Sequence, residues 1–204
     1  MKIISWNLLH RRGATLDQVK RLIAHHQPDL LLMQEATDLI DVLPSEIGGQ
    51  YVRDVLPGRA HGLAAWSPGR LRFSPSVVTL QPGVIVKRIC QIIDLKDFAV
   101  ANVHLSHGQL LNRRQLRCIA AILPARAAIL GDCNLLGPPF LPGFRDVGPR
   151  QPTHAAGAIL PVRLDRCFVR GLRCERPETL GRGTSDHRPI AVQLSIPAQP
   201  PESG

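Results

Sequence analysis

Polar side chains that could bind a metal ion or move protons stand at the ends of apolar runs in this sequence. Asn7, Glu35, His104, Asp132 and Asp186 each follow or end such a run. Short apolar runs are typical of buried strands, and strand ends on one edge of a sandwich can converge on one pocket. We therefore expect these five side chains to lie close together.

The residue types in this group favour a hard divalent cation. With Asn134 and His187 added, the group holds three carboxylates, two amides and two imidazoles. An oxygen-rich ligand set suits Mg²⁺ or Mn²⁺ better than zinc. Two neighbouring imidazoles can transfer protons or stabilise developing negative charge. The combination therefore predicts metal-assisted hydrolysis of a phosphoester.

Each of these residues alone also has an ordinary structural explanation. Asn7 could form a turn, Glu35 could be a charge at a helix N-terminus, and His104 could be a hydrogen-bonded core residue. Asp132 and Asn134 lie two positions apart, so an extended segment would place both on one side, but an Asx turn would also explain them. The prediction therefore rests on the combination of residues.

The elements that must position these side chains are about ten short strands and a few helices. Thr15 can cap a helix that ends at Gln27-Pro28, and further helices are expected around 38–43, before Pro44, and over 108–123. This mixture predicts two packed sheets with helices on their outer faces. Strands are expected at 2–9, 29–34, 51–56, 62–67, 71–80, 84–95, 98–105, 125–130, 164–169, 172–175 and 190–196.

Length and composition indicate one globular domain. The chain has 204 residues, of which 44% are hydrophobic and 20% charged, so disordered and collagen-like classes are excluded. We expect a single domain over 1–196 and a flexible tail over 197–204. No apolar run is long enough to span a membrane, and no secretory signal is recognisable. The five cysteines form no Cys-x-x-Cys motif, which favours free thiols and a cytoplasmic location.

The charge of the chain favours a polyanionic partner. Lys and Arg number 25 against 16 Asp and Glu, which gives a net charge of +9. Arg11 and Arg12 follow the first expected strand, and Arg113 and Arg114 stand in the last expected helix, so we expect these four to bind substrate phosphates. A GC-rich genome would also raise the arginine content, and arginines on a helix can simply be solvated.

A series of short motifs carries the candidate residues along the chain. In order they are Ser-Trp-Asn7, Gln34-Glu35, His61-Gly62 with Trp66-Ser67, Asn102-Val103-His104-Leu105, Gly131-Asp132-Cys133-Asn134, Leu164-Asp165 and Ser185-Asp186-His187-Arg188-Pro189. Their order and spacing resemble the endonuclease/exonuclease/phosphatase superfamily over nearly the whole chain. That group includes deoxyribonucleases, abasic-site endonucleases, neutral sphingomyelinases and inositol polyphosphate phosphatases. The resemblance implies an α/β fold, a four-layered α/β/β/α sandwich with two mostly antiparallel or mixed sheets.

The resemblance also implies where a metal ion would bind. Glu35 would be its main ligand, Asn7 would stand beside Glu35, and Asp186 would share the same region. The ion would be Mg²⁺ or Mn²⁺.

The remaining polar residues would act on the substrate if the resemblance holds. Asp132 and Asn134 would orient the attacking water and hold the phosphate. His187 would contact the scissile phosphate or act as base, and Asp165 would orient His187. His104 would act as acid or phosphate ligand.

The sequence departs from the superfamily pattern at three places. Cys133 stands where an aromatic residue is usual, and we expect it to pack in the core. No glutamate that could support the strand-end histidine is evident in 86–91. The segment 134–163 is short, so the loops that read the substrate must be trimmed.

The substrate stays open between two classes of phosphoester. The positive charge favours a divalent-metal-dependent phosphodiesterase that cleaves nucleic acid, and in particular a DNA nuclease. The alternative is a phosphatase or phosphodiesterase acting on inositol phosphates or phospholipids, for which the apolar segment 135–142 could form a rim. A non-catalytic binding module is disfavoured, because every core chemical position is occupied.

Overall fold

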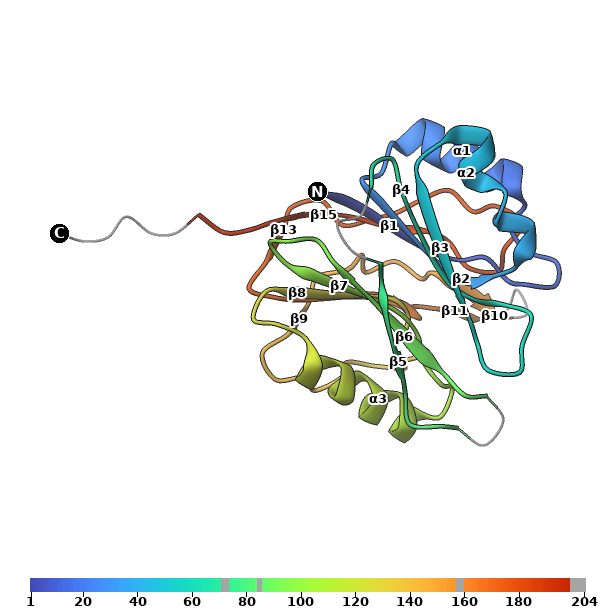
Figure 1. Cartoon of the computed structure of the whole chain (residues 1–204). Coiled ribbons are helices and arrows are strands. Elements are labelled where there is room, and N and C mark those ends of the chain that lie inside the picture. Colours follow the sequence, from blue (N-terminus) through green and yellow to red (C-terminus); the bar gives the residue numbers. More distant parts are fainter. Residues whose placement is uncertain (71–73, 84–85, 157–159, 199–204) are drawn as a thin grey trace.

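The computed structural model shows two large sheets with helices on their outer faces (Figure 1). It describes residues 1–70, 74–83, 86–156 and 160–198. The N-terminal part contains β1 (Lys2–Asn7), α1 (Leu16–His26), β2 (Leu30–Ala36), the 3₁₀ helix η1 (Asp38–Ile40), α2 (Leu43–Ile47), β3 (Gln50–Val55) and β4 (Gly62–Ser67). The remainder contains β5 (Ser76–Thr79), β6 (Ile89–Asp94), β7 (Ala99–His104), α3 (Gln109–Ile122), β8 (Ala127–Asp132), β9 (Arg145–Asp146), β10 (His154–Ala156), β11 (Leu160–Val162), β12 (Asp165–Arg170), β13 (Arg173–Cys174), β14 (Glu178–Thr179) and β15 (Ile190–Ser195).

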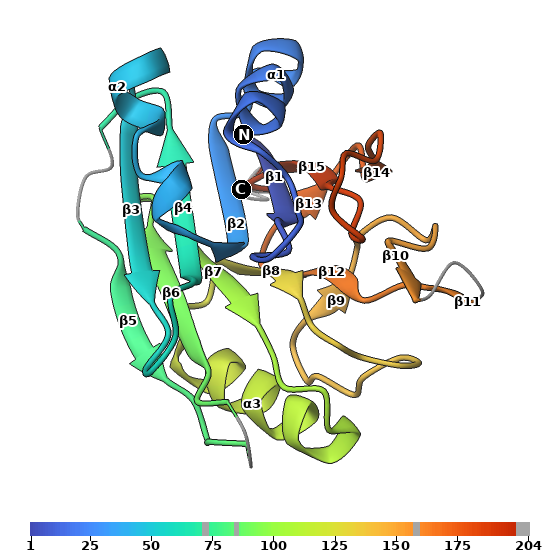
Figure 2. The same ribbon diagram turned by 90° about the vertical axis from the view of Figure 1, so that its right-hand side faces the viewer.

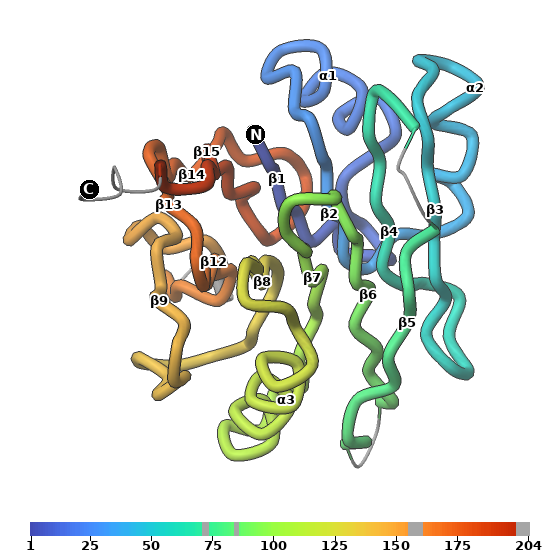
Figure 3. The backbone as a smooth tube through the Cα atoms, turned by 60° about the vertical axis from the view of Figure 1, so that its left-hand side comes forward, coloured from blue at the N-terminus to red at the C-terminus, as the bar shows by residue number. Residues whose placement is uncertain are grey.

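Each large sheet is mixed, with a parallel pair near its centre. The first sheet has the order β13-β15-β1-β2-β4-β3, with β14 also paired to β15, and the second has the order β5-β6-β7-β8-β12-β9 (Figure 3). β1 runs parallel to β2 and β7 runs parallel to β8. A parallel pair needs a crossover connection, and α1 and α3 form these two crossovers. The expected α/β sandwich with mixed sheets is confirmed.

Alternating side chains divide the apolar core into three layers. Successive residues of a strand face opposite sides of the sheet. Ile4 of β1 therefore packs with Val19 of α1, whereas its neighbour Ile3 packs with Val100 of β7 between the sheets. On the far side, Ile119 of α3 packs against Ile129 of β8. The result is four layers, with α1 and α2 on one outer face and α3 on the other (Figure 2).

The start of α2 corrects one predicted element. A helix over 38–43 that stops before Pro44 was expected, but η1 ends at Ile40 and α2 begins at Leu43, with Pro44 in its first turn. That prediction was wrong because proline breaks a helix interior yet suits a first turn, where its missing N–H costs nothing. In contrast, Thr15 caps α1 as expected.

Several further boundaries differ from the predicted ones. The strands expected at 71–80 and 84–95 are shortened to β5 and β6, and residues 71–73 and 84–85 lie outside the described residues. The two- and three-residue strands β9, β10, β11 and β14 were not predicted. Strand prediction relies on runs of about four or more residues, and these strands are shorter than that. Of the tail expected at 197–204, residues 199–204 also lie outside the described residues. No helix in the described part of the chain is long and apolar enough to cross a membrane.

Candidate active site

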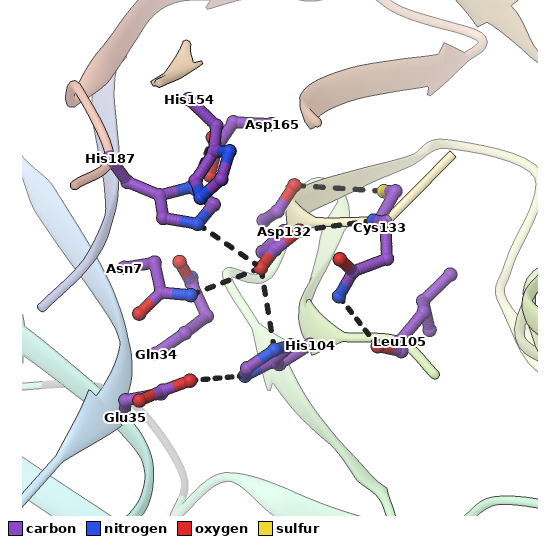
Figure 4. Close-up of polar contacts among 12 residues, drawn as sticks. Asn7, Gln34, Glu35, His104, Leu105, Asp132, Cys133, His154, Asp165 and His187 are labelled. Carbon is purple, nitrogen blue, oxygen red and sulfur yellow. Dashed lines mark hydrogen bonds and ion pairs between the residues drawn. The ribbon is translucent and has the colours of Figure 1, made fainter. Parts of the chain in front are cut away.

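The carboxyl ends of both parallel pairs meet at one edge of the sandwich (Figure 4). Asn7 lies opposite Gln34 in the β1–β2 pair, and His104 lies opposite Asp132 in the β7–β8 pair. Because β12 is antiparallel to β8, its first residue, Asp165, also lies opposite Asp132. Strand ends from both sheets therefore come together here, as the sequence led us to expect.

Asp132 is the centre of the polar contacts at this edge. Its Oδ2 accepts a hydrogen bond of 3.0 Å from Asn7 Nδ2 and lies 3.3 Å from His104 Nε2 and 3.7 Å from His187 Nε2. Its Oδ1 accepts a hydrogen bond from the Asn134 amide at 3.0 Å. The carboxyl group is only 2% exposed, and burial together with Asp165 raises its pKa, while His187 opposes the rise. One buried carboxylate thus joins both sheets.

A buried amide ladder holds the two sheets together directly beneath this site. Gln34 Nε2 of the first sheet donates to Asn102 Oδ1 of the second at 2.7 Å and to Ser5 Oγ at 3.0 Å. Asn102 Nδ2 in turn donates to Gln91 Oε1 at 3.1 Å. Buried polar groups bonded in such a chain specify one arrangement of the sheets. The ladder therefore fixes the spacing between the strand ends above it.

His187 is held by carboxylates on both sides of its ring. Its Nδ1 lies 2.8 Å from Asp165 Oδ2, and its Nε2 faces Asp132. Ser185 Oγ accepts a hydrogen bond from the His187 backbone amide at 3.1 Å. Burial alone would lower the pKa of His187, but the charges of Asp165 and Asp132 raise it to about 10. The ring is thus oriented and kept protonated at neutral pH.

His104 differs from His187 in its charge state. It is fully enclosed, and burial together with the charge of Arg88 brings its pKa well below the ordinary value, so the ring is neutral. Its Nδ1 has no hydrogen-bond partner among the described residues and lies 3.9 Å from Glu35 Oε1. A buried polar atom without a partner beside a carboxylate oxygen suits a position where a ligand completes the site.

The loop after β8 forms an Asx turn. This is the structural explanation that the sequence also allowed for the spacing of Asp132 and Asn134. Asn134 has a left-handed backbone (φ 48°), and its own amide bonds to Asp132 Oδ1. Its side chain donates to the Leu105 carbonyl at 3.0 Å, which ties the loop to the end of β7. Between them, Cys133 is completely buried in the core beside α3. Asp132 and Asn134 thus lie close together, with the Asn134 amide group engaged by the backbone.

Glu35 leaves the regular ladder of β2 through a bulge. The pairing with β4 shifts between Gln34 and Ala36, and Glu35 has φ 56°, which is uncommon for a residue with a side chain. Glu35 Oε2 accepts a hydrogen bond of 3.1 Å from the His10 amide and pairs with His10 Nδ1. The ring of His61 stacks on that of His10, with centroids 3.9 Å apart. These three side chains offer ligand atoms within 4.8 Å of one another.

Asp186 contacts a different partner from the one expected. It was grouped with Glu35 and Asn7, but its Oδ2 lies 3.3 Å from His154 Nε2, the first residue of β10. The His154 ring lies 4.5 Å from the ring of His187, and the two residues form a β-bridge. Within the described residues no direct contact joins Asp186 to Glu35. The candidate ligands therefore fall into two groups.

Sequence reasoning missed four residues at this edge, namely His10, His61, His154 and Arg88. Arg88 is only 5% exposed, and its Nε has no partner among the described residues. Burial lowers its pKa, while the charges of Asp132 and Glu35 oppose that effect, so the guanidinium lies within reach of the site. A buried guanidinium with an unbonded N–H is costly, which makes Arg88 suited to an anionic ligand. The sequence offered two signals for these residues. His61 stands in the motif His61-Gly62, and Arg88 directly precedes an apolar run.

The four arginines proposed to bind substrate have different surroundings. Arg11 and Arg12 are exposed and line a cavity of about 510 Å³ that also reaches Glu35. Arg113 is occupied, because it donates to the Gln109 carbonyl and to the Leu136 carbonyl, both at 2.8 Å. Arg114 is exposed on α3. The first pair thus borders the site, whereas Arg113 is tied to its own helix and to the loop after β8.

Comparisons with known proteins agree with this arrangement. The model of the endonuclease/exonuclease/phosphatase family matches residues 4–187. Among curated proteins, none matches the sequence significantly.

Solved structures of low sequence identity share the fold. One is TDP2 of D. rerio complexed with single strand DNA product, with 15% identity, a TM-score of 0.75, and coverage of 96% of this chain and 99% of that chain. A mannosyl-6-phosphatase of Bacteroides thetaiotaomicron has 17% identity, a TM-score of 0.75, and coverage of 96% and 100%. An endonuclease/exonuclease/phosphatase family protein of the same species has 16% identity, a TM-score of 0.77, and coverage of 97% and 95%. With strand-end carboxylates, amides and histidines on this fold and a family match over most of its length, the chain belongs to the endonuclease/exonuclease/phosphatase family.

Proposed function

We propose that the chain is a divalent-metal-dependent phosphodiesterase and that DNA is its substrate. The observation that carries the proposal is His187 held between Asp165 and Asp132, with His104 between Asp132 and Glu35. A protonated imidazole can stabilise charge on a phosphate, and a carboxylate whose second oxygen accepts no hydrogen bond from the described residues can bind a metal ion.

Glu35 is the residue best suited to hold the proposed metal. Its Oε1 accepts no hydrogen bond from the described residues and faces the unpartnered Nδ1 of His104. Asn7 is the neighbouring candidate, although its amide already donates to Asp132 and accepts a bond from the Leu9 amide. The oxygen donors make Mg²⁺ or Mn²⁺ the proposed ions. When bound, such an ion would neutralise the charge that develops on the phosphate.

His187 and Asp132 divide the proton work in this proposal. Because the pKa of His187 is raised to about 10, its ring carries a proton at neutral pH and donates to the phosphate. Asp132 is then the acceptor beside the attacking water, with Asn134 holding its second oxygen. Asp165 keeps His187 charged and oriented. Of the two roles expected for His187, this supports contact with the phosphate.

His104 and Arg88 complete the proposed phosphate site. The pKa of His104 is too low for a proton donor at neutral pH, which supports a phosphate ligand over an acid. The guanidinium of Arg88 could pair with a phosphate bidentately, and such a pair would offset the cost of its burial. Both residues lie at the end of the second sheet that faces Glu35.

The choice of DNA rests on charge. The chain carries a net charge of +9, and the exposed Arg11 and Arg12 border the cavity next to Glu35. Contacts from arginine to successive phosphates give sequence-independent affinity for nucleic acid. One structural relative was solved with single strand DNA product.

A small-molecule or lipid phosphoester is the alternative substrate. Leu136 is 54% exposed and Phe140 is 83% exposed in the loop that follows Asn134, which would suit an apolar rim for inositol lipids or phospholipids. Another structural relative is a mannosyl-6-phosphatase. This alternative predicts release of phosphate or headgroup from such substrates while DNA stays intact.

A substrate panel tests the two proposals directly. Purified protein is incubated with supercoiled plasmid, with mannose 6-phosphate and with inositol phosphates, in Mg²⁺ or Mn²⁺ and with or without chelator. We expect chelator-sensitive nicking of the plasmid and little phosphate release from the monoesters. Phosphate release while the plasmid stays intact would favour a small-molecule or lipid phosphoester as substrate instead of DNA. Hydrolysis at the same rate with and without chelator would contradict metal dependence.

A further inference from the structure

Three side chains from separate elements meet at the first sheet's end of the site. His10 follows β1, Glu35 stands in the bulge of β2, and His61 immediately precedes β4. Their nitrogen and oxygen ligand atoms lie within 4.8 Å of one another. The side chains of His10 and Glu35 are 30% and 15% exposed, so a solvated ion could reach them through the adjoining cavity.

The geometry of the group exceeds what an ion pair requires. A pair between Glu35 and His10 would need only those two side chains, and it uses only the Oε2 oxygen. Yet His61 is also present, and its ring stacks on His10 at 3.9 Å with an interplanar angle of 18°. Both imidazoles thus lie beside one carboxylate whose Oε1 accepts no hydrogen bond from the described residues. Because a ring nitrogen binds a metal in the plane of its ring, one of the two rings must turn out of the stack to share an ion with the other.

We propose that His10, Glu35 and His61 form a two-histidine, one-carboxylate site that binds a borderline divalent transition metal in preference to Mg²⁺. Imidazole nitrogen is a good ligand for ions from Mn²⁺ to Zn²⁺, whereas Mg²⁺ demands oxygen ligands in octahedral geometry. Two histidines and one carboxylate leave coordination positions open for water and substrate. The inference rests on the proposed function only in that both assign Glu35 as a metal ligand.

The second histidine group lacks the features that carry this inference. In the group of His154, Asp186 and His187, both ring nitrogens of His187 already face carboxylates, Asp165 and Asp132. A metal there would have to displace one of these contacts. In the group around Glu35, an ion would have to replace the carboxylate–imidazole contact of a single pair among the described residues, Glu35 Oε2 with His10 Nδ1.

Metal affinity measured without any substrate tests the proposal. Tag-free protein is stripped with chelator, and the binding of Co²⁺ and of Mg²⁺ is measured by calorimetry and, for Co²⁺, by visible absorption. We expect Co²⁺ to bind at least ~100-fold more tightly than Mg²⁺. His10→Gln and His61→Gln should each weaken Co²⁺ binding at least ~10-fold and change its absorption bands. Binding of Mg²⁺ as tight as that of Co²⁺ would overturn the proposal.

Two controls separate a ligand role from a folding defect and from the proposed activity. His25→Gln changes a histidine on α1 and should leave Co²⁺ binding unchanged, and circular dichroism should show that all three variants are folded. Unchanged Co²⁺ affinity in folded His10→Gln and His61→Gln overturns the inference, even if the protein hydrolyses DNA with Mg²⁺. Weakened affinity in both variants supports it, even if no phosphoester is hydrolysed.

Discussion

The two sides of the site are built in opposite ways. At the end of β2, Glu35 is 15% exposed, departs from the strand ladder through a left-handed backbone and has one oxygen that accepts no hydrogen bond from the described residues. On the other side, His187 and Asp165 are 6% and 0% exposed and are bonded to each other. The open side can accept an ion from solution, whereas on the closed side the raised pKa of His187 keeps its ring protonated at neutral pH.

The fold thereby separates two tasks within one site. Asp132 lies between the two sides, because it faces His104, which neighbours Glu35, and also faces His187. A change on the open side should alter metal dependence, and a change on the closed side should alter pH dependence. Substitutions on each side, and in the arginines beyond them, should therefore differ in both the size and the kind of their effect.

Replacement of Glu35 should have the largest effect. Glu35→Ala should reduce hydrolysis by about 10³-fold, because the loss of a metal that neutralises phosphate charge is worth several kcal/mol. The fold should survive, since Glu35 lies in a bulge. Initial rates are compared with those of Glu46→Ala, which removes an exposed carboxylate of α2 that pairs with Lys20. Normal turnover by Glu35→Ala would refute the metal assignment.

Replacement of Asp165 should act on the closed side through His187. Asp165→Asn removes the charge that most raises the pKa of His187, so His187 should lose its proton at lower pH. We expect activity to fall by about 10²-fold and the alkaline limb of the pH–rate profile to move toward neutral pH. The measurement is kcat/KM across pH for both proteins. An alkaline limb that stays in place would argue against His187 as the protonated group.

The same pKa shift should make stability depend on pH. The pKa of His187 is about 10 in the folded protein and about 6.5 when unfolded, so the folded state binds the proton more tightly. Its stabilising contribution is complete below pH ~6.5 and is lost as the pH rises through about 10. Urea midpoints at several pH values should fall over this window, and fall less in Asp165→Asn. Parallel curves would contradict the linkage.

The arginines should give the smallest effect. Arg11→Ala combined with Arg12→Ala should lower the slope of log K against log salt for DNA binding by about 2, one unit for each phosphate that the variant no longer neutralises. Arg113→Ala should leave the slope unchanged, because its guanidinium is occupied by two carbonyl groups. Filter binding at several salt concentrations measures both. If the double variant has the same slope as the parent protein, Arg11 and Arg12 do not contact the phosphates of bound DNA.

The sequence was informative wherever a polar residue ended an apolar run. Such runs predicted β1, β7 and β8, and with them the meeting of Asn7, His104 and Asp132. In a parallel pair the carboxyl ends of both strands lie side by side, so their last side chains are neighbours. The local apolar pattern was therefore sufficient to predict that these side chains lie close together.

Other parts of the site depend on backbone geometry that no local pattern reveals. His10 and His61 stack on each other beside Glu35, which lies in a bulge where the pairing of β2 with β4 shifts. His154 begins β10, which pairs with β11, and both strands have only three residues, too few for a periodic pattern to reveal. Arg88 is buried against the usual preference of arginine, so its place near the charges of Asp132 and Glu35 could not be read from the sequence.

A metal titration of one variant from each side tests most directly whether the site has a metal-binding side and a proton-holding side. Plasmid nicking is measured over a wide range of Mn²⁺ for Glu35→Asp, which retains a shorter carboxylate, and for His187→Gln, which retains polarity without charge. We predict that Glu35→Asp recovers activity as Mn²⁺ rises, while His187→Gln stays about 10²-fold or more below the parent protein at every concentration. Recovery of His187→Gln by metal, or no response of Glu35→Asp, would contradict the division of the site into a metal side and a proton side.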